Sequence, residues 1–115
     1  WHIGGGGSEP AFASGFTTAG TPYQNFRFRL NRSGELEIDG AFGGSQITDG
    51  YFNVIQLPLK HRPSKNTFVP AALYVNASGY FPSFIEIQTD GWIRAHITAS
   101  GGGHTYYLNL NRIAL

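Results

Sequence analysis

The fold is decided by residues 25–42, which read NFRFRLNRSGELEIDGAF. Before the central turn, phenylalanine or leucine alternates with arginine, and after it leucine or isoleucine alternates with glutamate or aspartate. Alternation with a period of two is typical of a strand that has one buried and one exposed face. Residues 31–34, which end in glycine, predict a tight turn. We therefore expect a β-hairpin whose apolar side chains face a core and whose arginines pair with carboxylates across the strands.

The whole chain has the composition of an all-β domain. Charged residues make up 13% of its 115 residues, whereas about 25% is usual in soluble domains. Sixteen glycines and an aromatic content of 15% take the place of the missing charge. Aromatic and β-branched residues favour strands, and glycine favours turns. The length fits one domain that buries a small core without disulfides.

Further strand-like segments follow the hairpin, and Gly-rich or Pro-bounded loops separate them. They cover residues 51–57, 68–75, 84–87, 92–98 and 105–110. We expect about seven or eight short strands, arranged as an antiparallel β-sandwich or jelly-roll-like barrel over residues 23–115. Residues 1–22 form an N-terminal Gly-rich segment, in which residues 4–8 are either a native connection or an engineered flexible linker. The chain does not begin with methionine, and we expect it to be a piece of a longer protein.

Two of these segments, residues 68–75 and 84–87, are nearly all apolar. Such strands are usually covered on both faces, whereas a sandwich of this size has only one interior. We therefore expect self-association to cover the second face. The alternative is a single aromatic-rich core with a few exposed apolar side chains, which is common in monomers.

Several classes of partner have no support in the sequence. The net charge is +1 and the basic residues are scattered, so nucleic acid is not an expected partner. The chain has no cysteine, which excludes thiolate metal sites and disulfides. No apolar run approaches the roughly 20 residues of a membrane span, so membrane insertion is not expected.

Catalytic and metal-binding motifs are also missing. The histidines at positions 2, 61, 96 and 104 do not share a strand face at metal-ligand spacing, so we expect no metal site. Glu35, Glu37 and Asp39 line one strand face, and such a row is usually solvated rather than catalytic. No nucleophile elbow and no phosphate-binding loop occurs. We expect neither enzymatic activity nor a cofactor.

The candidate ligand-binding residues are Asp90, Trp92, Arg94 and His96. Side chains two apart share a face of a strand, so Trp92, Arg94 and His96 form a row above a turn that contains Asp90. An indole can stack on a sugar ring, and the polar groups can bind hydroxyls or a phosphate. The alternative is that Trp92 belongs to the core or to a subunit interface.

Other aromatic residues lie near the expected loops, where binding residues often occur. They are Tyr51, Phe52, Tyr80 and Phe81, each of which can equally anchor a loop. Tyr106 and Tyr107 point to opposite faces of the last strand, so only one of them is available on a given side.

A set of short motifs occurs in a recognisable order. It comprises Glu9-Pro10-Ala11-Phe12, Phe26-Arg27-Phe28-Arg29, residues 36–42, Gln56-Leu57-Pro58, Arg62-Pro63 and Asp90-Gly91. Together they resemble the C-terminal head domain of tailed-phage receptor-binding proteins and tail fibres. The resemblance covers roughly residues 9 to 110, although each motif alone has little specificity.

The resemblance implies a β-sandwich or jelly-roll head that assembles as a homotrimer at the tip of a tail fibre or baseplate. Such heads adhere to saccharides of the host cell surface, so the chain is expected on the virion, outside the cell. Its partners would be two further copies of itself, the host saccharide and the remainder of the fibre or baseplate. The row from Asp90 to His96 comes from the strand pattern and is not carried over from the family.

Two other functions stay open. The chain could be a structural module that trimerises or caps a viral fibre without a ligand of its own. A degradative enzyme domain is a weaker alternative, because no catalytic motif supports it.

Overall fold

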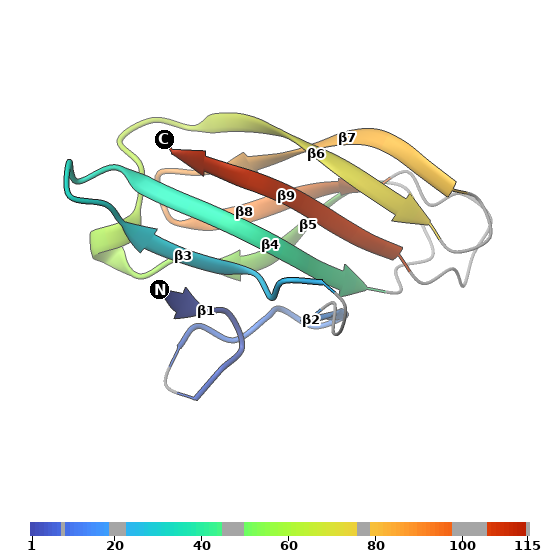
Figure 1. Cartoon of the computed structure of the whole chain (residues 1–115), viewed down its shortest axis with the longest axis horizontal. Coiled ribbons are helices and arrows are strands. Elements are labelled where there is room, and N and C mark those ends of the chain that lie inside the picture. Colours follow the sequence, from blue (N-terminus) through green and yellow to red (C-terminus); the bar gives the residue numbers. More distant parts are fainter. Residues whose placement is uncertain (8, 19–22, 45–49, 76–78, 98–105, 115) are drawn as a thin grey trace.

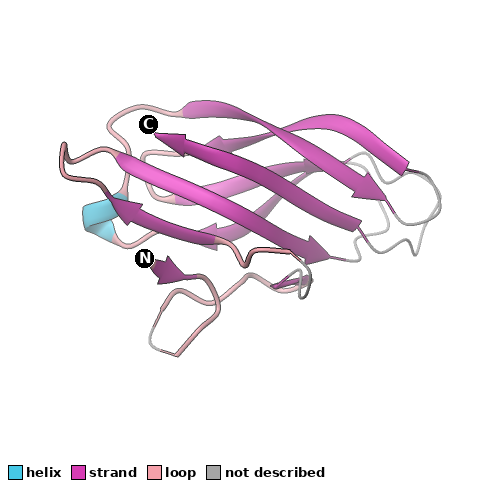
Figure 2. Cartoon of the chain, in the orientation of Figure 1, coloured by secondary structure: helices cyan, strands magenta, loops and turns pink. Residues whose placement is uncertain are grey.

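The computed structural model describes residues 1–7, 9–18, 23–44, 50–75, 79–97 and 106–114. These residues form nine β-strands and one short 3-10 helix, η1 (Leu59–His61), which is the cyan segment in Figure 2. The strands are β1 (His2–Ile3), β2 (Phe16–Thr18), β3 (Arg27–Leu30), β4 (Leu36–Gly44), β5 (Gly50–Gln56), β6 (Thr67–Val75), β7 (Gly79–Ile87), β8 (Trp92–Ile97) and β9 (Tyr106–Ala114). Among the described residues, no helix is long and apolar enough to cross a membrane.

The strands form two antiparallel sheets that pack face to face (Figure 1). Hydrogen bonding follows the order β1-β3-β4-β9-β6-β7-β8-β5, and β2 adds to β4. Pairing between β9 and β6 is confined to Ala72–Val75, after Pro70, which has no N–H to offer a neighbouring strand. Because β9 and β6 pair over only these few residues, the continuous strand order folds into two four-stranded layers. One layer is β1-β3-β4-β9 and the other is β6-β7-β8-β5. The predicted all-β sandwich is confirmed.

The N-terminal segment joins the two sheets at the edge formed by β5, on the far side from the β9–β6 pairing. Phe12 forms an isolated bridge with Ile55 of β5, and the Ala13 N–H donates to the Val54 carbonyl at 2.7 Å. Gly4 is buried, and its N–H donates to the Phe26 carbonyl at 3.0 Å. A Cβ atom at position 4 would lie 2.9 Å from Ile55 Cδ1. Glycine at this position therefore has a packing role, which a flexible linker would not require.

The core lies between the two sheets and starts with the predicted hairpin. Phe28 of β3 pairs with Ile38 of β4, and both side chains are fully buried. The facing sheet contributes Ile85, Ile87 and Ile93, which are also fully buried. One buried side chain of this size contributes about 1.5–3 kcal/mol. The period-two alternation that predicted the hairpin therefore selects its core face correctly.

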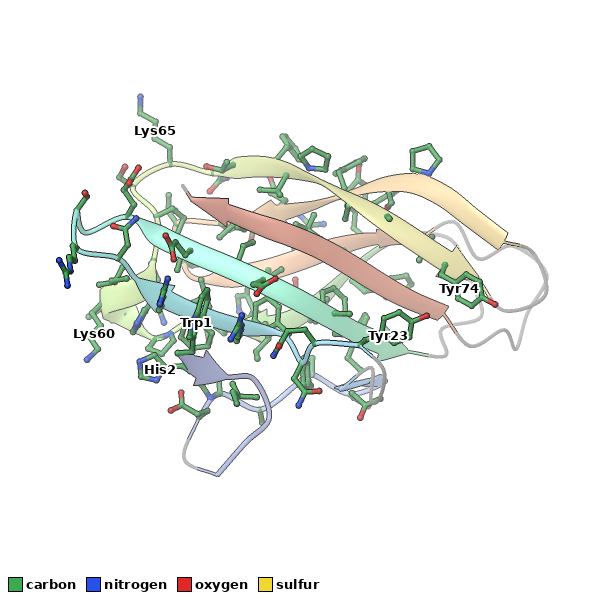
Figure 3. All side chains as sticks on the ribbon, viewed as in Figure 1. Trp1, His2, Tyr23, Lys60, Lys65 and Tyr74 are labelled. Atoms are coloured by element: carbon green, nitrogen blue, oxygen red, sulfur yellow. The ribbon has the colours of Figure 1, made fainter. Side chains whose placement is uncertain are left out.

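The arginines of β3 pair with the carboxylates of β4, as predicted. Arg27 Nη2 donates to Asp39 Oδ2 at 2.7 Å, and Arg29 Nε donates to Glu37 Oε1 at 2.7 Å. The Trp1 ring, which is labelled in Figure 3, stacks on both guanidinium groups, and the distances from its centroid to Arg27 Cζ and Arg29 Cζ are 4.2 and 4.1 Å. Cross-strand pairs of this kind contribute about 0.2–1 kcal/mol each. Both carboxylates thus belong to an ion-pair face that holds β1, β3 and β4 together.

In the single chain the core covers one face of β6 and β7, and the other face is the one that the expected self-association would cover. Val69 and Leu73 of β6 are buried, whereas Phe68, which directly precedes Val69, is 63% exposed. In β7, Ile85 and Ile87 are buried. Both strands therefore alternate in burial like half-buried strands. Their sequences look nearly all apolar because most outer-face side chains, such as Phe68 and Phe84, are apolar too, although Glu86 is an exception. We call this surface the outer face of the β6-β7-β8-β5 sheet.

Candidate functional site

Strand β8 presents the candidate residues on the outer face of the β6-β7-β8-β5 sheet. Ile93 and Ala95 are fully buried. Trp92, Arg94 and His96, which alternate with them, point away from the core and are partly exposed. Strand β8 lies between β7 and β5. The predicted row is therefore present, and its neighbours come from the two flanking strands.

Asp90 shapes the turn below this row. Its Oδ1 accepts from the Trp92 backbone N–H at 3.1 Å, and its carbonyl accepts from Gln56 Nε2 at 3.0 Å. An aspartate that accepts from the backbone two residues later is a common turn-forming arrangement. Asp90 is exposed, so its second carboxylate oxygen is available to a ligand.

Arg94 is held by groups on both sides. Its Nη1 lies 3.4 Å from Glu86 Oε1, which also accepts from Gln88 Nε2 at 3.0 Å. Its Cζ lies 5.2 Å from the centroid of the Tyr51 ring. The charge of Arg94 is thus partly balanced by Glu86, and its guanidinium is positioned rather than free.

His96 belongs to a row of rings that crosses the sheet from β6 to β5. It stacks on Phe84 of β7 at 5.0 Å and lies 4.9 Å from Tyr51 of β5. Phe84 in turn meets Phe68 of β6 edge to face at 5.5 Å. His96 therefore packs against aromatic neighbours, and Tyr51, which is 51% exposed, takes the more accessible position.

A shallow depression of about 460 Å³ adjoins this row. It is lined by Tyr51, Phe52, Asn53, Gln88, Asp90, Trp92 and Arg94. The structure thus brings together Asp90, Trp92 and Arg94, and leaves His96 outside the lining. Two aromatic rings beside amide, carboxylate and guanidinium groups can stack on a sugar ring and bind its hydroxyls.

Sequence reasoning placed Tyr51 near a loop but did not join it to the site, and it missed Asn53 and Gln88. The antiparallel register of β5 and β8 sets Tyr51 opposite His96 and Asn53 opposite Arg94. Phe52 packs against the core instead of presenting a ring to a ligand. The side chains of Tyr80, Phe81, Tyr106 and Tyr107 lie outside the described residues.

Two histidines meet at the other sheet. The His61 ring is 3% exposed and lies edge to face with His2 at 5.0 Å and with Phe28 at 5.1 Å. His2 Nδ1 lies 2.9 Å from Glu9 Oε1. No group of three or more potential metal ligands occurs within the described ranges, and His104 lies outside them. Burial is the main cause that lowers the pKa of His61 below its usual value of 6.5, followed by His2 and Lys60, while Glu9 raises it.

This histidine predicts an acid-sensitive fold. The unfolded chain takes up the His61 proton at a higher pH than the folded chain, so its contribution to stability is complete above about pH 6.5 and is lost on acidification. We expect the free energy of unfolding to fall between about pH 7.5 and pH 5.5, by at most about 1.4 kcal/mol per pH unit. Urea denaturation across this range measures the slope.

The control for this prediction is His61→Phe, which keeps a ring against Phe28 and His2. The variant lacks the titrating group, so its stability should depend less steeply on pH in the same window. Equal slopes in the two proteins would show that His61 is not the source of the pH dependence and would contradict the prediction.

Comparisons of the chain with protein-family models, with curated proteins and with solved structures found no match.

Proposed function

We propose that this chain is a non-catalytic binding head that recognises saccharide on a host cell surface. The observation that carries the proposal is the depression in which Trp92 and the half-exposed Tyr51 lie beside Asn53, Gln88 and Asp90. Saccharide sites commonly combine an aromatic platform with a few polar groups. In this proposal the rings stack on the sugar, while the amides and the carboxylate bind hydroxyls.

The same proposal places the head as a homotrimer at the tip of a phage tail fibre or baseplate, outside the cell. The resemblance of the ordered motifs suggests this setting, and the outer face of the sheet supports assembly. Its apolar part is formed by the partly or fully exposed Phe68, Pro70, Ala72, Pro82 and Phe84. Contiguous apolar surface is uncommon on monomers and frequently marks a protein interface.

Assembly would also make a shallow site useful. An open depression buries only part of a ligand, so each site alone is expected to bind weakly. Three copies that engage one polymeric surface gain avidity, in favourable geometry by about 10²–10⁴. The net charge of +1 adds no general attraction for nucleic acid or anionic membranes.

A glycan array probed with the isolated chain is the first test, followed by titration of the best saccharide. Tyr51→Ala and Trp92→Ala should each weaken that binding about tenfold, which corresponds to about 1.4 kcal/mol. The physical reason is the loss of ring surface from the depression. Tyr51→Phe is the matched control, because it keeps the ring and removes only the hydroxyl group.

The outcomes separate the remaining functions. Unchanged binding in both alanine variants would contradict this site. An array without any hit, from a chain that still assembles, would favour the structural trimerisation or capping module. The contacts of Arg94 with Glu86 and of His96 with Phe84 support that alternative, because they engage both side chains within the sheet. Shortening of a bound saccharide would instead reveal a degradative enzyme.

A further inference from the structure

Some basic side chains of this chain are paired with carboxylates and others are not. In the sheets, Arg27, Arg29 and Arg94 each contact a carboxylate. Four other cations, Arg32, Lys60, Arg62 and Lys65, form no ion pair within the described ranges. All four come from the turn between β3 and β4 or from the segment around η1.

Three of these unpaired cations surround one pocket. It has a volume of about 360 Å³ and is lined by Leu30, Gly34, Leu36, Lys60, His61, Arg62, Pro63, Ser64, Lys65 and Thr67. Figure 3 shows Lys60 and Lys65 at the same end of the molecule, with their exposed side chains pointing in opposite directions, so both must turn toward the pocket to reach a bound anion. Glu35 follows the pocket-lining Gly34, and its Oε1 accepts from Asn31 Nδ2 at 3.2 Å. No carboxylate side chain lines the pocket itself.

Arg62 is held in place by the backbone. Its Nε donates to the Leu57 carbonyl at 3.0 Å, which leaves the two terminal nitrogens of the guanidinium for another acceptor. The Leu57 N–H donates in turn to the Gly91 carbonyl at 2.8 Å. Pro58 and Pro63 restrict the backbone on either side of η1. A preorganised guanidinium loses little side-chain freedom when it binds an anion.

His61 gives the pocket a buried polar wall. The side chain is 3% exposed, and its Nδ1 has no hydrogen-bond partner among the described residues. A buried polar atom without a partner costs about 1–3 kcal/mol. An oxyanion in the pocket, or a water molecule held by one, would supply the missing partner.

We propose that the pocket formed by Lys60, Arg62 and Lys65 binds one phosphate group. A phosphate carries up to two negative charges and several acceptor oxygens, which matches two ammonium groups, one guanidinium and the hydroxyl of Ser64. The Thr67 hydroxyl already donates to the Lys65 carbonyl at 3.2 Å. The isolated cluster on a chain of net charge +1 fits a single phosphate better than the repeated phosphates of a nucleic acid. This site is separate from the Tyr51 depression and does not depend on the proposed saccharide function.

Titration of the ¹⁵N-labelled chain with inorganic phosphate tests the proposal, with chloride keeping the ionic strength constant. We expect saturable shifts of amide signals within residues 60–67. Lys60→Gln and Lys65→Gln should each weaken phosphate binding about two- to fivefold, and the double variant about tenfold. Both side chains are exposed, so the variants should retain the dispersed spectrum of the folded chain.

Arg32→Gln is the matched control, because it removes the same charge at the same end but from outside the pocket. It should weaken phosphate binding less than twofold if the pocket is the site. No saturable shift at millimolar phosphate would overturn the proposal, and so would an equal loss in Arg32→Gln, which would indicate a diffuse charge effect.

A second titration identifies where the phosphate comes from. Glucose 6-phosphate that binds more tightly than inorganic phosphate indicates a phosphate carried on a saccharide, whereas equal affinities indicate that free phosphate is sufficient. Unphosphorylated glucose should leave the signals of residues 60–67 in place. Shifts of the same size with glucose would contradict recognition of a phosphate.

Discussion

Replacing Gly40 by alanine is expected to destabilise the fold by more than about 3 kcal/mol, well above the cost of most point substitutions. Gly40 is buried in β4 and has a φ of +95°, a conformation that residues with a side chain rarely adopt. An added Cβ would collide with the Asn25 carbonyl oxygen and lie 2.6 Å from its carbon. The opposing atoms are backbone, so no side-chain rotation relieves the contact.

The hydrogen bonds around Gly40 explain why the backbone cannot move aside. The Phe26 N–H donates to the Ala41 carbonyl at 3.1 Å, and the Ala41 N–H donates to the Gln24 carbonyl at 2.8 Å. Pairing of β4 with β9 also shifts register between Ile38 and Gly40. To relieve the clash, the backbone would have to break these hydrogen bonds between residues 24–26 and Ala41. The same bonds position Phe26 in the core.

Gly34→Ala is the matched control for this prediction. Gly34 has a φ of +79° in the exposed turn between β3 and β4, but a Cβ there would meet no atom within 4 Å. Only the conformational cost of about 1–2 kcal/mol should appear. Urea denaturation of both variants separates the steric part from the conformational part. Similar losses in the two variants would contradict the close approach of Asn25.

Local sequence patterns predicted much of this fold because they depend on neighbours along the chain. Alternation in residues 25–42 predicted both strands of the hairpin, the ion pairs of Arg27 and Arg29, and the buried face. The same reasoning placed Trp92, Arg94 and His96 on one face of β8, and the structure buries Ile93 and Ala95 on the other. The order of the strands was not predictable in this way, since β4 pairs with the distant β9.

The candidate site shows the same division. Alternation in β8 predicted the shared face of Trp92 and Arg94, whereas the approach of Tyr51 depends on the register between β5 and β8. The burial of His61 was also missed, because it comes from contacts with His2 and Phe28 on other strands. Nothing within the Pro-bounded segment indicates those contacts.

The outer face of the β6-β7-β8-β5 sheet has two parts with different chemistry. Phe68 and Phe84, on β6 and β7, belong to an apolar part, and Trp92 and Arg94, on β8, belong to a part that lines the polar depression. In the proposed trimer, this division would let one part contact other subunits while the other stays open to a ligand. It also means that the two proposals can be tested with different substitutions on one surface.

Phe68→Glu should therefore abolish self-association if the apolar part is the subunit interface. Phe68 is 63% exposed in the single chain and contacts Phe84 edge to face, so its substitution should not disturb the core. A carboxylate buried without a partner at an interface costs about 3–5 kcal/mol, which would lower the association constant by roughly 10²–10⁴ per contact. Light scattering should show three chains for the parent protein and one for the variant.

The control introduces a glutamate at an exposed apolar side chain outside the proposed interface. Leu59→Glu introduces the same charge at a side chain that is 79% exposed on η1, away from the outer face. It should leave the assembly intact, because Leu59 is not part of the apolar surface of β6 and β7. Dissociation by Leu59→Glu would move the interface to the η1 end. A parent protein with the mass of a single chain would remove the trimer from the proposal, and the saccharide site would then have to bind without avidity.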